Sequence, residues 1–417
     1  MSMTEPKASL SEALEVLLRF GTLMLRAGDT AFRVRDAMGM LADSMGLDRL
    51  DLQVTLNSMT ATVRRGEEYA TLTREIAPIG INSWRIAELE RLAQAKPRDL
   101  TPKVLGAKLD AIEAVPSLRP VLVVAIAIGL ASGSFSYLNG GDLLGTVAAA
   151  IAGGLGQGLR ALLFIRRGNQ YAVTALCAVF TAGLYCLLIA ALAPTGFGPG
   201  HAAGFIFSVL FLVPGFPLIA GLLDLMQHQL AAGIVRLFYG VMILLAAAIG
   251  LSAVAAVAGL TVAPAPTTAY HLDAPTIALR ALASLVGGCG FAILYNSSTR
   301  AVIAVGILSL LGNDLRLVLY DFGMPLAPAT FCGALLVGLL ASLVRAWWRE
   351  PRIALTVPSI IIMTPGLYAF QTIVMLNQGE VLPAMQAGAS CFFIVGGMAM
   401  GLAAARFVTE RRWLVED

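Results

Sequence analysis

Two prolines enclose a glycine and a phenylalanine in the middle of the fourth apolar segment of this 417-residue chain, in the order Pro214-Gly215-Phe216-Pro217. Proline lacks a backbone donor and clashes with the preceding turn, so the motif predicts a broken membrane-spanning helix. Broken backbone at membrane depth is tolerated only where it is buried in protein or lines a wet cavity. The half-helix after the break presents N–H groups and a positive dipole end, which suit a carboxylate. A proline kink without a ligand is the alternative.

A second Pro-Gly pair, Pro365-Gly366, lies in the ninth apolar segment, after Thr364 instead of a valine. Two breaks that meet at the membrane midplane would bracket one small molecule with a carboxylate. Gln371, one turn further on, could hydrogen-bond such a molecule or satisfy the broken backbone. The candidate substrate-binding residues are therefore Pro214, Gly215, Phe216, Pro365, Gly366 and Gln371.

Asp224, about two turns beyond Pro217, is an ionisable group near the end of the fourth apolar segment. Such a group is costly in a membrane and is a functional candidate, because desolvation favours the protonation that proton coupling requires. Arg236 is its nearest partner in sequence, so a structural ion pair is the alternative. A third polar cluster, Asn313, Asp314 and Arg316, lies near the end of the seventh segment and is a candidate outer gate or ion pair.

The elements that carry these residues form two copies of one pattern. Phe135, Leu138 and Asn139 align with Phe291, Leu294 and Asn296; residues 156–160 align with 312–316; and residues 213–216 align with 364–367. Each copy holds five apolar segments, and an odd number reverses the topology of the second copy. Inverted repeats are a common transporter plan with the substrate site between the halves. The pattern therefore favours a solute carrier over an enzyme. For Arg316, its alignment with Arg160 can account for its position, and a substrate role is the alternative.

Spans of about 20 apolar residues are predicted at 119–137, 142–165, 171–193, 203–224, 234–260, 276–295, 300–319, 327–347, 355–376 and 384–407. Basic residues lie on one side of these spans, at Arg166, Arg167, Arg236, Arg300, Arg345, Arg349, Arg352, Arg411 and Arg412. The opposite loops, 139–142, 194–201, 262–275 and 377–380, contain no lysine or arginine. Cytoplasmic loops carry the basic residues, so both termini are predicted to be cytosolic. Arg280 and Arg316 are the exceptions.

The first 115 residues are predicted to form a small cytosolic α+β domain, followed by membrane repeats at 116–262 and 263–417. Helices are predicted at 8–26, 30–45 and 83–95, and strands at 50–56, 60–64 and 69–73 with a turn at Gly66. An amphipathic stretch at 101–115 could lie in the membrane interface or pack on this domain. The domain has no histidine or cysteine, which favours a regulatory or gating role over catalysis.

Composition sets the class: 58% of the residues are hydrophobic and 13% are charged, as in a polytopic membrane protein. The slight positive charge indicates no nucleic-acid partner, and we expect no cleaved signal peptide. The five cysteines lie in apolar segments without disulfide or metal spacing. We therefore expect no cofactor, and the partners predicted are a small solute, protons and the bilayer. A homo-oligomer is compatible with the sequence, which does not indicate the oligomeric state.

The run from Gly28 to Arg35, Gly-Asp-Thr-Ala-Phe-Arg-Val-Arg, together with Val54-Thr55, resembles the threonine/serine exporter family, and so does the membrane part with its Pro-Gly breaks. The resemblance implies a proton-driven exporter of small amino acids in the bacterial cytoplasmic membrane. In some members the halves are separate proteins, and such a pair is associated with succinate export. A dicarboxylate exporter is therefore the alternative within the family. A channel, or a receptor whose N-terminal domain signals, is the alternative outside the family.

Overall fold

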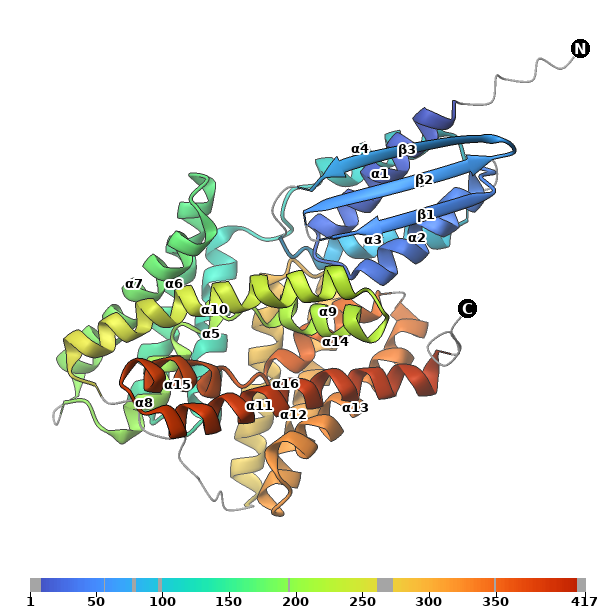
Figure 1. The fold of residues 1–417 in the computed structure, drawn as a ribbon. Coiled ribbons are helices and arrows are strands. Elements are labelled where there is room, and N and C mark those ends of the chain that lie inside the picture. The colour runs from blue at the N-terminus through green and yellow to red at the C-terminus, as the bar shows by residue number, and fades with distance from the viewer. Residues whose placement is uncertain are drawn as a thin grey trace, which may run out of the picture. The chain divides into compact units, whose positions relative to one another are not determined.

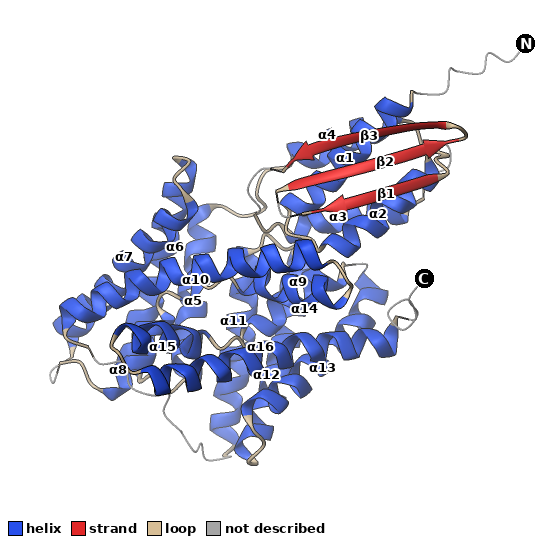
Figure 2. Ribbon diagram, in the orientation of Figure 1, coloured by secondary structure: helices blue, strands red, loops and turns tan. Residues whose placement is uncertain are grey.

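The structure is a computed structural model that describes residues 9–55, 57–76, 80–96, 100–193, 196–260, 273–348 and 350–410. Of the residues used above, Leu56, Pro194, the segment 262–272, Arg349, Arg411 and Arg412 lie outside this description. The chain divides into two compact units. Unit 1 comprises Met1–Leu118 and Ala220–Leu237, and unit 2 comprises Arg119–Ile219 and Phe238–Asp417. Most of the described chain is helical, and its one sheet lies in unit 1 (Figures 1 and 2).

The sheet of unit 1 has three antiparallel strands, β1 (Arg49–Val54), β2 (Ser58–Arg65) and β3 (Glu68–Glu75), in the order β1-β2-β3. The turn between β2 and β3 includes Gly66 at φ +60°, which glycine adopts without strain. Met59, Ala61 and Val63 alternate along β2 and are fully buried against the helices. The period of two along the strand therefore assigns one face to the core.

Four helices complete the head, the name we use for the described elements from α1 to α4. They are α1 (Leu10–Arg26), α2 (Ala31–Ser44), α3 (Ser83–Gln94) and α4 (Pro102–Ala114). Ser9 and Glu12 form a capping box at α1, and Asn82 caps α3. Each helix buries one apolar stripe, so the predicted α+β composition of this region is present.

The helix α4 packs on the core of the head. Leu105 and Leu109 are fully buried in the hydrophobic core of the head, and Ile112 packs against that core. Arg19 of α1 also pairs with Asp110 and Glu113 at 2.6 and 2.8 Å. The apolar face that the sequence offered to a membrane interface is thus occupied by the head. The apolar stripe of this helix therefore packs on the head, which is one of the two placements that the sequence left open.

Unit 1 also includes a helical hairpin from the membrane sequence, Ala220–Leu237. It comprises the end of α9 (Gly215–Met226) and the start of α10 (Leu230–Ala258). Gly221 and Gly233 bring the two helices together, because a methyl group on Gly233 would lie 2.8 Å from the Gly221 carbonyl oxygen. His228 lies in the turn between them at φ +55°. The compact unit is therefore larger than the predicted domain of 115 residues.

Unit 2 contains the remaining helices. They are α5 (Val121–Leu138), α6 (Leu143–Ile165), α7 (Gln170–Leu192), α8 (Pro199–Phe207), the 3-10 turn η1 (Leu210–Leu212), α11 (Ala274–Leu294), α12 (Thr299–Asp321), α13 (Leu326–Trp348), α14 (Arg352–Ile361), α15 (Gly366–Asn377) and α16 (Val381–Thr409). Among the described residues, eight helices are long and apolar enough to cross a membrane, or up to ten segments if each bent pair is one span. The ten predicted spans coincide with these segments to within a few residues.

Both Pro-Gly pairs interrupt their helices, as the sequence predicted. The first pair of helices, Gly200–Leu212 and Gly215–Met226, is bent by 63°. The second, Arg352–Ile361 and Gly366–Asn377, is bent by 55°. In each case the new helix begins at the glycine, because proline cannot continue the preceding ladder of hydrogen bonds.

Candidate functional site

The two helix breaks meet inside unit 2. A methyl group on Gly215 would lie 3.4 Å from Ile361 Cγ1 and 3.5 Å from Thr364 Cγ2. A methyl group on Gly366 would lie 3.5 Å from Leu210 Cδ1 and 3.8 Å from Val213 Cγ2. We call the two segments 210–215 and 361–366 the break junction. Each glycine therefore packs against the residues that precede the other glycine.

These contacts are reciprocal in the predicted alignment. Val213 aligns with Thr364, and Leu210 and Ile361 each stand three residues earlier. Gly215 thus touches the counterparts of the residues that Gly366 touches. The two segments also make equivalent backbone hydrogen bonds. The Gly215 and Gly366 amides donate to the carbonyls of Val213 and Thr364, at 2.9 Å each. Aligned rings also meet, with the centroids of Phe135 and Phe291 5.8 Å apart.

The two half-helices differ at their first turns. The Ala369 amide donates the first backbone hydrogen bond of α15, to the Pro365 carbonyl. The amides of Leu367 and Tyr368 therefore have no acceptor within the helix. No side chain caps α15. In α9 the corresponding bond runs from Leu218 to Pro214, and Pro217 has no N–H to offer. The second half-helix therefore presents more donors to an anion than the first.

Two predicted binding residues are buried near these breaks but take part in packing. Phe216 is fully buried, and its ring meets that of Tyr295 edge-on at 5.5 Å. Gln371 is buried in α15, and it interacts with other residues of the chain. For Phe216, the aromatic contact is a sufficient reason for its burial.

The predicted cluster on the seventh span is present in part and is larger than expected. The Asn313 amide donates to Ser284 Oγ at 2.9 Å, and Arg316 Nη1 donates to Asn313 Oδ1 at 3.1 Å. Nearby on the same two helices, Arg280 and Asp321 form a buried ion pair at 2.6 Å. Asp314 has a buried carboxylate oxygen without a hydrogen-bond partner among the described residues. The sequence did not assign Ser284 or Asp321, because nothing in their spacing ties them to their partners Asn313 and Arg280, which are 29 and 41 positions away.

Asp224 lies at the N-terminal end of α2 in unit 1. Its Oδ1 accepts hydrogen bonds from the Ala31 and Phe32 amides at 2.7 and 3.4 Å. Arg236 lies 3.6 Å from Asp224 Oδ2 and donates to the Asp29 carbonyl at 2.8 Å. The side chains of Asp224 and Arg236 are buried. The carboxylate thus caps a helix from outside it, which satisfies two donors and complements the helix dipole.

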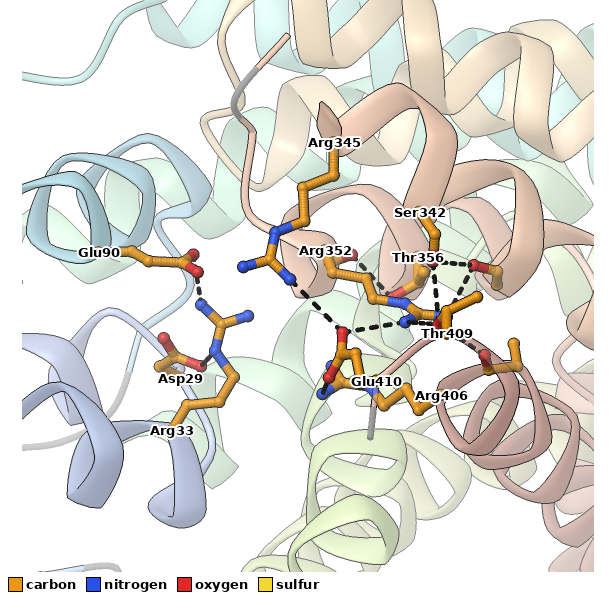
Figure 3. Close-up of polar contacts among 12 residues, drawn as sticks. Asp29, Arg33, Glu90, Ser342, Arg345, Arg352, Thr356, Arg406, Thr409 and Glu410 are labelled. Carbon is orange, nitrogen blue, oxygen red and sulfur yellow. Dashed lines mark hydrogen bonds and ion pairs between the residues drawn. The ribbon is translucent and has the colours of Figure 1, made fainter. Parts of the chain in front are cut away.

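The loop that leads into α2 is built for this contact. Gly28 has φ +100°, and a methyl group there would lie 3.0 Å from the Gly80 carbonyl oxygen. Asp29 is fully buried, and its Oδ1 lies 3.1 Å from Arg33 Nε, which in turn bonds Glu90 (Figure 3). Burial raises the pKa of the Asp29 carboxyl above its usual range, although the charge of Arg33 opposes this. The run from Gly28 to Arg35 therefore forms the surface of the head that binds the α9–α10 hairpin.

A second network, in unit 2, joins the ends of three helices (Figure 3). Arg352 Nη1 donates to Thr409 and Glu410 at 2.7 and 2.9 Å, and its Nη2 donates to the Gly338 carbonyl at 2.8 Å. Arg345 and Arg406 also lie within 3.4 and 3.6 Å of the Glu410 carboxylate. Burial opposes ionisation of Glu410, but these arginines hold its pKa below the usual range. The network fastens α13, α14 and α16 together. The sequence indicated Arg345 and Arg352 as part of a basic side but indicated neither Arg406 nor the carboxylate that the three arginines share.

Comparison with known proteins identifies this architecture. Residues 15–258 match the family described as putative threonine/serine exporter, and residues 280–408 match the family described as threonine/serine exporter, ThrE. The chain belongs to the threonine/serine exporter family. The two matched ranges include the head from residue 15 onward and both Pro-Gly breaks. They also include the polar cluster on α11 and α12 and the residues around Asp224. No solved structure matches this chain.

Relatives of this exporter-family protein carry two kinds of name. A probable succinate transporter subunit, YjjP, of Klebsiella aerogenes is 25% identical over 60% of this chain and 95% of its own length. YjjP of Escherichia coli is 27% identical over 56% of this chain and 90% of its own length. A probable threonine/serine exporter of Mycobacterium tuberculosis is 24% identical over 94% of this chain and 76% of its own length. The last relative spans both halves, as this chain does.

Proposed function

We propose that this protein is a secondary active transporter that exports threonine and serine from the cytosol by proton antiport. The observation that carries the proposal is the break junction, where two interrupted apolar helices place Gly215 and Gly366 against each other's flanking residues. Interrupted helices of this kind bind substrate at the midplane of many transporters. The substrate carboxylate binds at the half-helix ends that begin at Gly215 and Gly366. Pro214 and Pro365 keep those ends free of a preceding helical turn.

An inverted repeat of two five-span halves is part of the proposal, and three further contacts support it. Ser132 packs on Gly153 in the first half, and Gly288 packs on Ser309 at the aligned positions of the second, so the serine and the glycine have exchanged places. Asp142 caps α6, and Ser298 caps α12 at the aligned position.

Each of these caps also contacts the start of a broken helix. Asp142 lies 3.1 Å from His201 near the start of α8, and Ser298 donates to Glu350 at 2.7 Å, two residues before α14. The aligned caps thus both contact the segment at the start of a broken helix, at partner positions that differ by two residues in the alignment. With the basic loops in the cytosol, the protein lies in the bacterial cytoplasmic membrane with both termini inside.

Transport proceeds by alternating access. Cytosolic substrate binds at the junction, one half rocks against the other, and the junction opens outside. The junction must separate for this, because even a methyl group on Gly215 or Gly366 would lie at van der Waals distance from the opposite segment. Asn313, Asp314 and Arg316 on α12 gate the outer side. Gln371 in α15 completes the polar lining.

Proton coupling is assigned to Asp224 within the same proposal. Its carboxylate accepts two amide bonds from α2 and faces Arg236, and both interactions weaken when the carboxylate is protonated. Because α9 continues from Gly215 to Asp224, a change at this cap acts on the same helix that opens the junction. The head is then a gating domain that responds to the protonation of one buried group.

A dicarboxylate exporter is the second candidate, favoured by the two relatives named as probable succinate transporter subunits. Inverted membrane vesicles with and without the protein test both candidates. We expect labelled threonine to accumulate when the vesicle lumen is acidic, serine to compete, and the accumulation to vanish without a pH gradient. Accumulation of labelled succinate alone would identify a dicarboxylate, instead of threonine, as the substrate. Equilibration without accumulation would indicate a channel. No flux of either compound would contradict the transporter proposal.

A further inference from the structure

Two half-buried arginines of unit 2 have no carboxylate partner among the described residues. Arg160 of α6 donates from Nη1 to the Phe211 carbonyl at 3.4 Å, and its guanidinium lies 5.3 Å from the centre of the Phe164 ring. Arg316 of α12 donates from Nη1 to Asn313 Oδ1 at 3.1 Å. The Nε atom of each arginine is buried without a hydrogen-bond partner among the described residues. Within the part of the chain that the structure describes, neither forms an ion pair with an acidic side chain.

The arginines whose whole side chains are buried do face a carboxylate. Arg236 faces Asp224, Arg280 faces Asp321 and Arg352 faces Glu410, with nitrogen-to-oxygen distances between 2.6 and 3.6 Å. A buried charge without a partner is costly, and breaking a buried pair by removing one partner is strongly destabilising. Arg160 and Arg316 therefore call for an anion that the described residues do not supply.

A side-chain amide accompanies each arginine. Gln157 and Asn313 precede Arg160 and Arg316 by three residues, a spacing that puts amide and guanidinium on one face of a helix. Gln157 is 7% exposed, and its Oε1 has no hydrogen-bond partner among the described residues. An unsatisfied buried acceptor beside an unpaired cation matches the two charged ends of an amino acid. The arginine suits the carboxylate and the amide oxygen suits the ammonium group.

Both pairs lie beside the break junction. A methyl group on Gly156 would lie 3.0 Å from the Phe211 ring, and Phe211 belongs to η1 just before Val213 and Pro214. In the other half, a methyl group on Gly312 would lie 2.9 Å from Met363 Cε, directly before Thr364 and Pro365. Each amide–arginine pair is therefore in the helix that packs on the segment leading into a break.

We infer that Arg160 and Arg316 bind the carboxylate of the transported substrate, one in each half of the protein, with Gln157 and Asn313 beside them. The inference rests on the proposed transport function and deepens it. Arg160, on the side with the basic loops, receives the carboxylate from the cytosol, and Arg316 receives it on the outer side. A monocarboxylate engages them in turn, whereas a dicarboxylate can engage both.

The first test replaces each arginine by glutamine in the full-length protein. We expect R160Q and R316Q to raise the substrate concentration for half-maximal transport by about 10- to 100-fold, the range for loss of a charge-assisted bond. R300Q is the matched control, because Arg300 is an exposed residue in the first turn of α12. Labelled threonine and labelled succinate are assayed in parallel in inverted and right-side-out vesicles. Half-saturation values within twofold of wild type for both variants would overturn the inference, whereas absence of wild-type flux would overturn the proposed function instead.

The second test supplies each arginine with its own carboxylate. N313D and Q157E change little in shape but place an acidic group on the same helical face as Arg316 or Arg160. We expect thermal stability in detergent to be kept or increased, because a half-buried cation gains a partner, while transport is lost. Preserved stability with unchanged half-saturation would show that the arginines serve structure only and would contradict the inference. This test does not depend on whether the glutamine variants fold.

Discussion

Asp224 accepts the first two amides of α2, so one carboxylate holds the head to the α9–α10 hairpin. An N-terminal cap of this kind stabilises a helix by about 0.5–2 kcal/mol. Its value here is also positional, because Arg236 bonds the backbone of Asp29 in the same loop. The run from Gly28 to Arg35, which resembles the exporter family, therefore lies in a docking surface within unit 1.

Neutralising Asp224 tests its assignment as the proton-coupling group. We expect Asp224→Asn to transport with a flattened dependence on the pH gradient, because asparagine keeps an acceptor for the Ala31 amide but cannot titrate. The control is Asp142→Asn, since Asp142 also caps a helix, through the Gly145 amide at 2.7 Å. Flux is measured in inverted vesicles over a series of pH gradients. If Asp224→Asn keeps the wild-type pH dependence, the pair with Arg236 is structural only.

Asp29 predicts a pH dependence of the docked loop. Because burial raises its pKa from 3.8, the stability that its protonated form gives is present below that value and is lost as pH rises through the folded-state pKa. We expect hydrogen–deuterium exchange of the α2 amides, corrected for intrinsic rates, to show this loss in the full-length protein. Asp29→Asn should remove the slope while Arg33 keeps Glu90 as its partner. An equal slope in wild type and Asp29→Asn would refute this.

At the scale of elements, the break junction makes a graded prediction for glycine replacements. A methyl group on Gly215 meets Ile361 and Thr364 at ordinary contact distances, so we expect Gly215→Ala to transport nearly normally. Gly215→Leu should force the segments apart and reduce substrate affinity by about tenfold or more, since overpacking costs about 1–3 kcal/mol. Gly366→Ala and Gly366→Leu should behave in the same way.

The matched control is Gly183→Leu, because a side chain on Gly183 of α7 meets nothing within 4 Å. Half-saturation is measured for threonine and succinate in each variant. Normal affinity in both leucine variants at the junction would show that substrate does not bind at the half-helix ends.

The sequence predicted the two helix breaks better than it predicted contacts between residues far apart in the chain. Helix breaks at Pro214 and Pro365 follow from local backbone chemistry, which needs no knowledge of neighbours. The predicted contact of the two breaks depended on the repeat, and the structure places them together. The cap that Asp224 gives to α2 could not be inferred, because it joins residues far apart in sequence through a fold-dependent turn at Gly28. The unpaired state of Arg160 and Arg316 is equally invisible until their neighbours are known.

At the scale of the whole molecule, an inverted repeat requires the two halves to obey one packing scheme, even where residue types differ. Ser132 contacts Gly153 between α5 and α6, and at the aligned positions Gly288 contacts Ser309 between α11 and α12. In the second half Ser309 Oγ also donates to the Ser359 carbonyl at 3.1 Å. The aligned place in the first half is the Ser208 carbonyl, 3.1 Å from a methyl group placed on Gly153.

This relation predicts that the first half can adopt the arrangement of the second. Gly153→Ser alone should lower stability by about 1–3 kcal/mol, because its side chain would collide with Ser132. Adding Ser132→Gly removes the collision and leaves the new hydroxyl facing the Ser208 carbonyl, so the double variant should recover most of the loss. Thermal unfolding in detergent of wild type, both single variants and the double variant forms a double-mutant cycle with a coupling energy of opposite sign to the Gly153→Ser loss. Additive losses would mean that the two halves do not share this packing scheme, and the inverted repeat would lose its support from side-chain contacts.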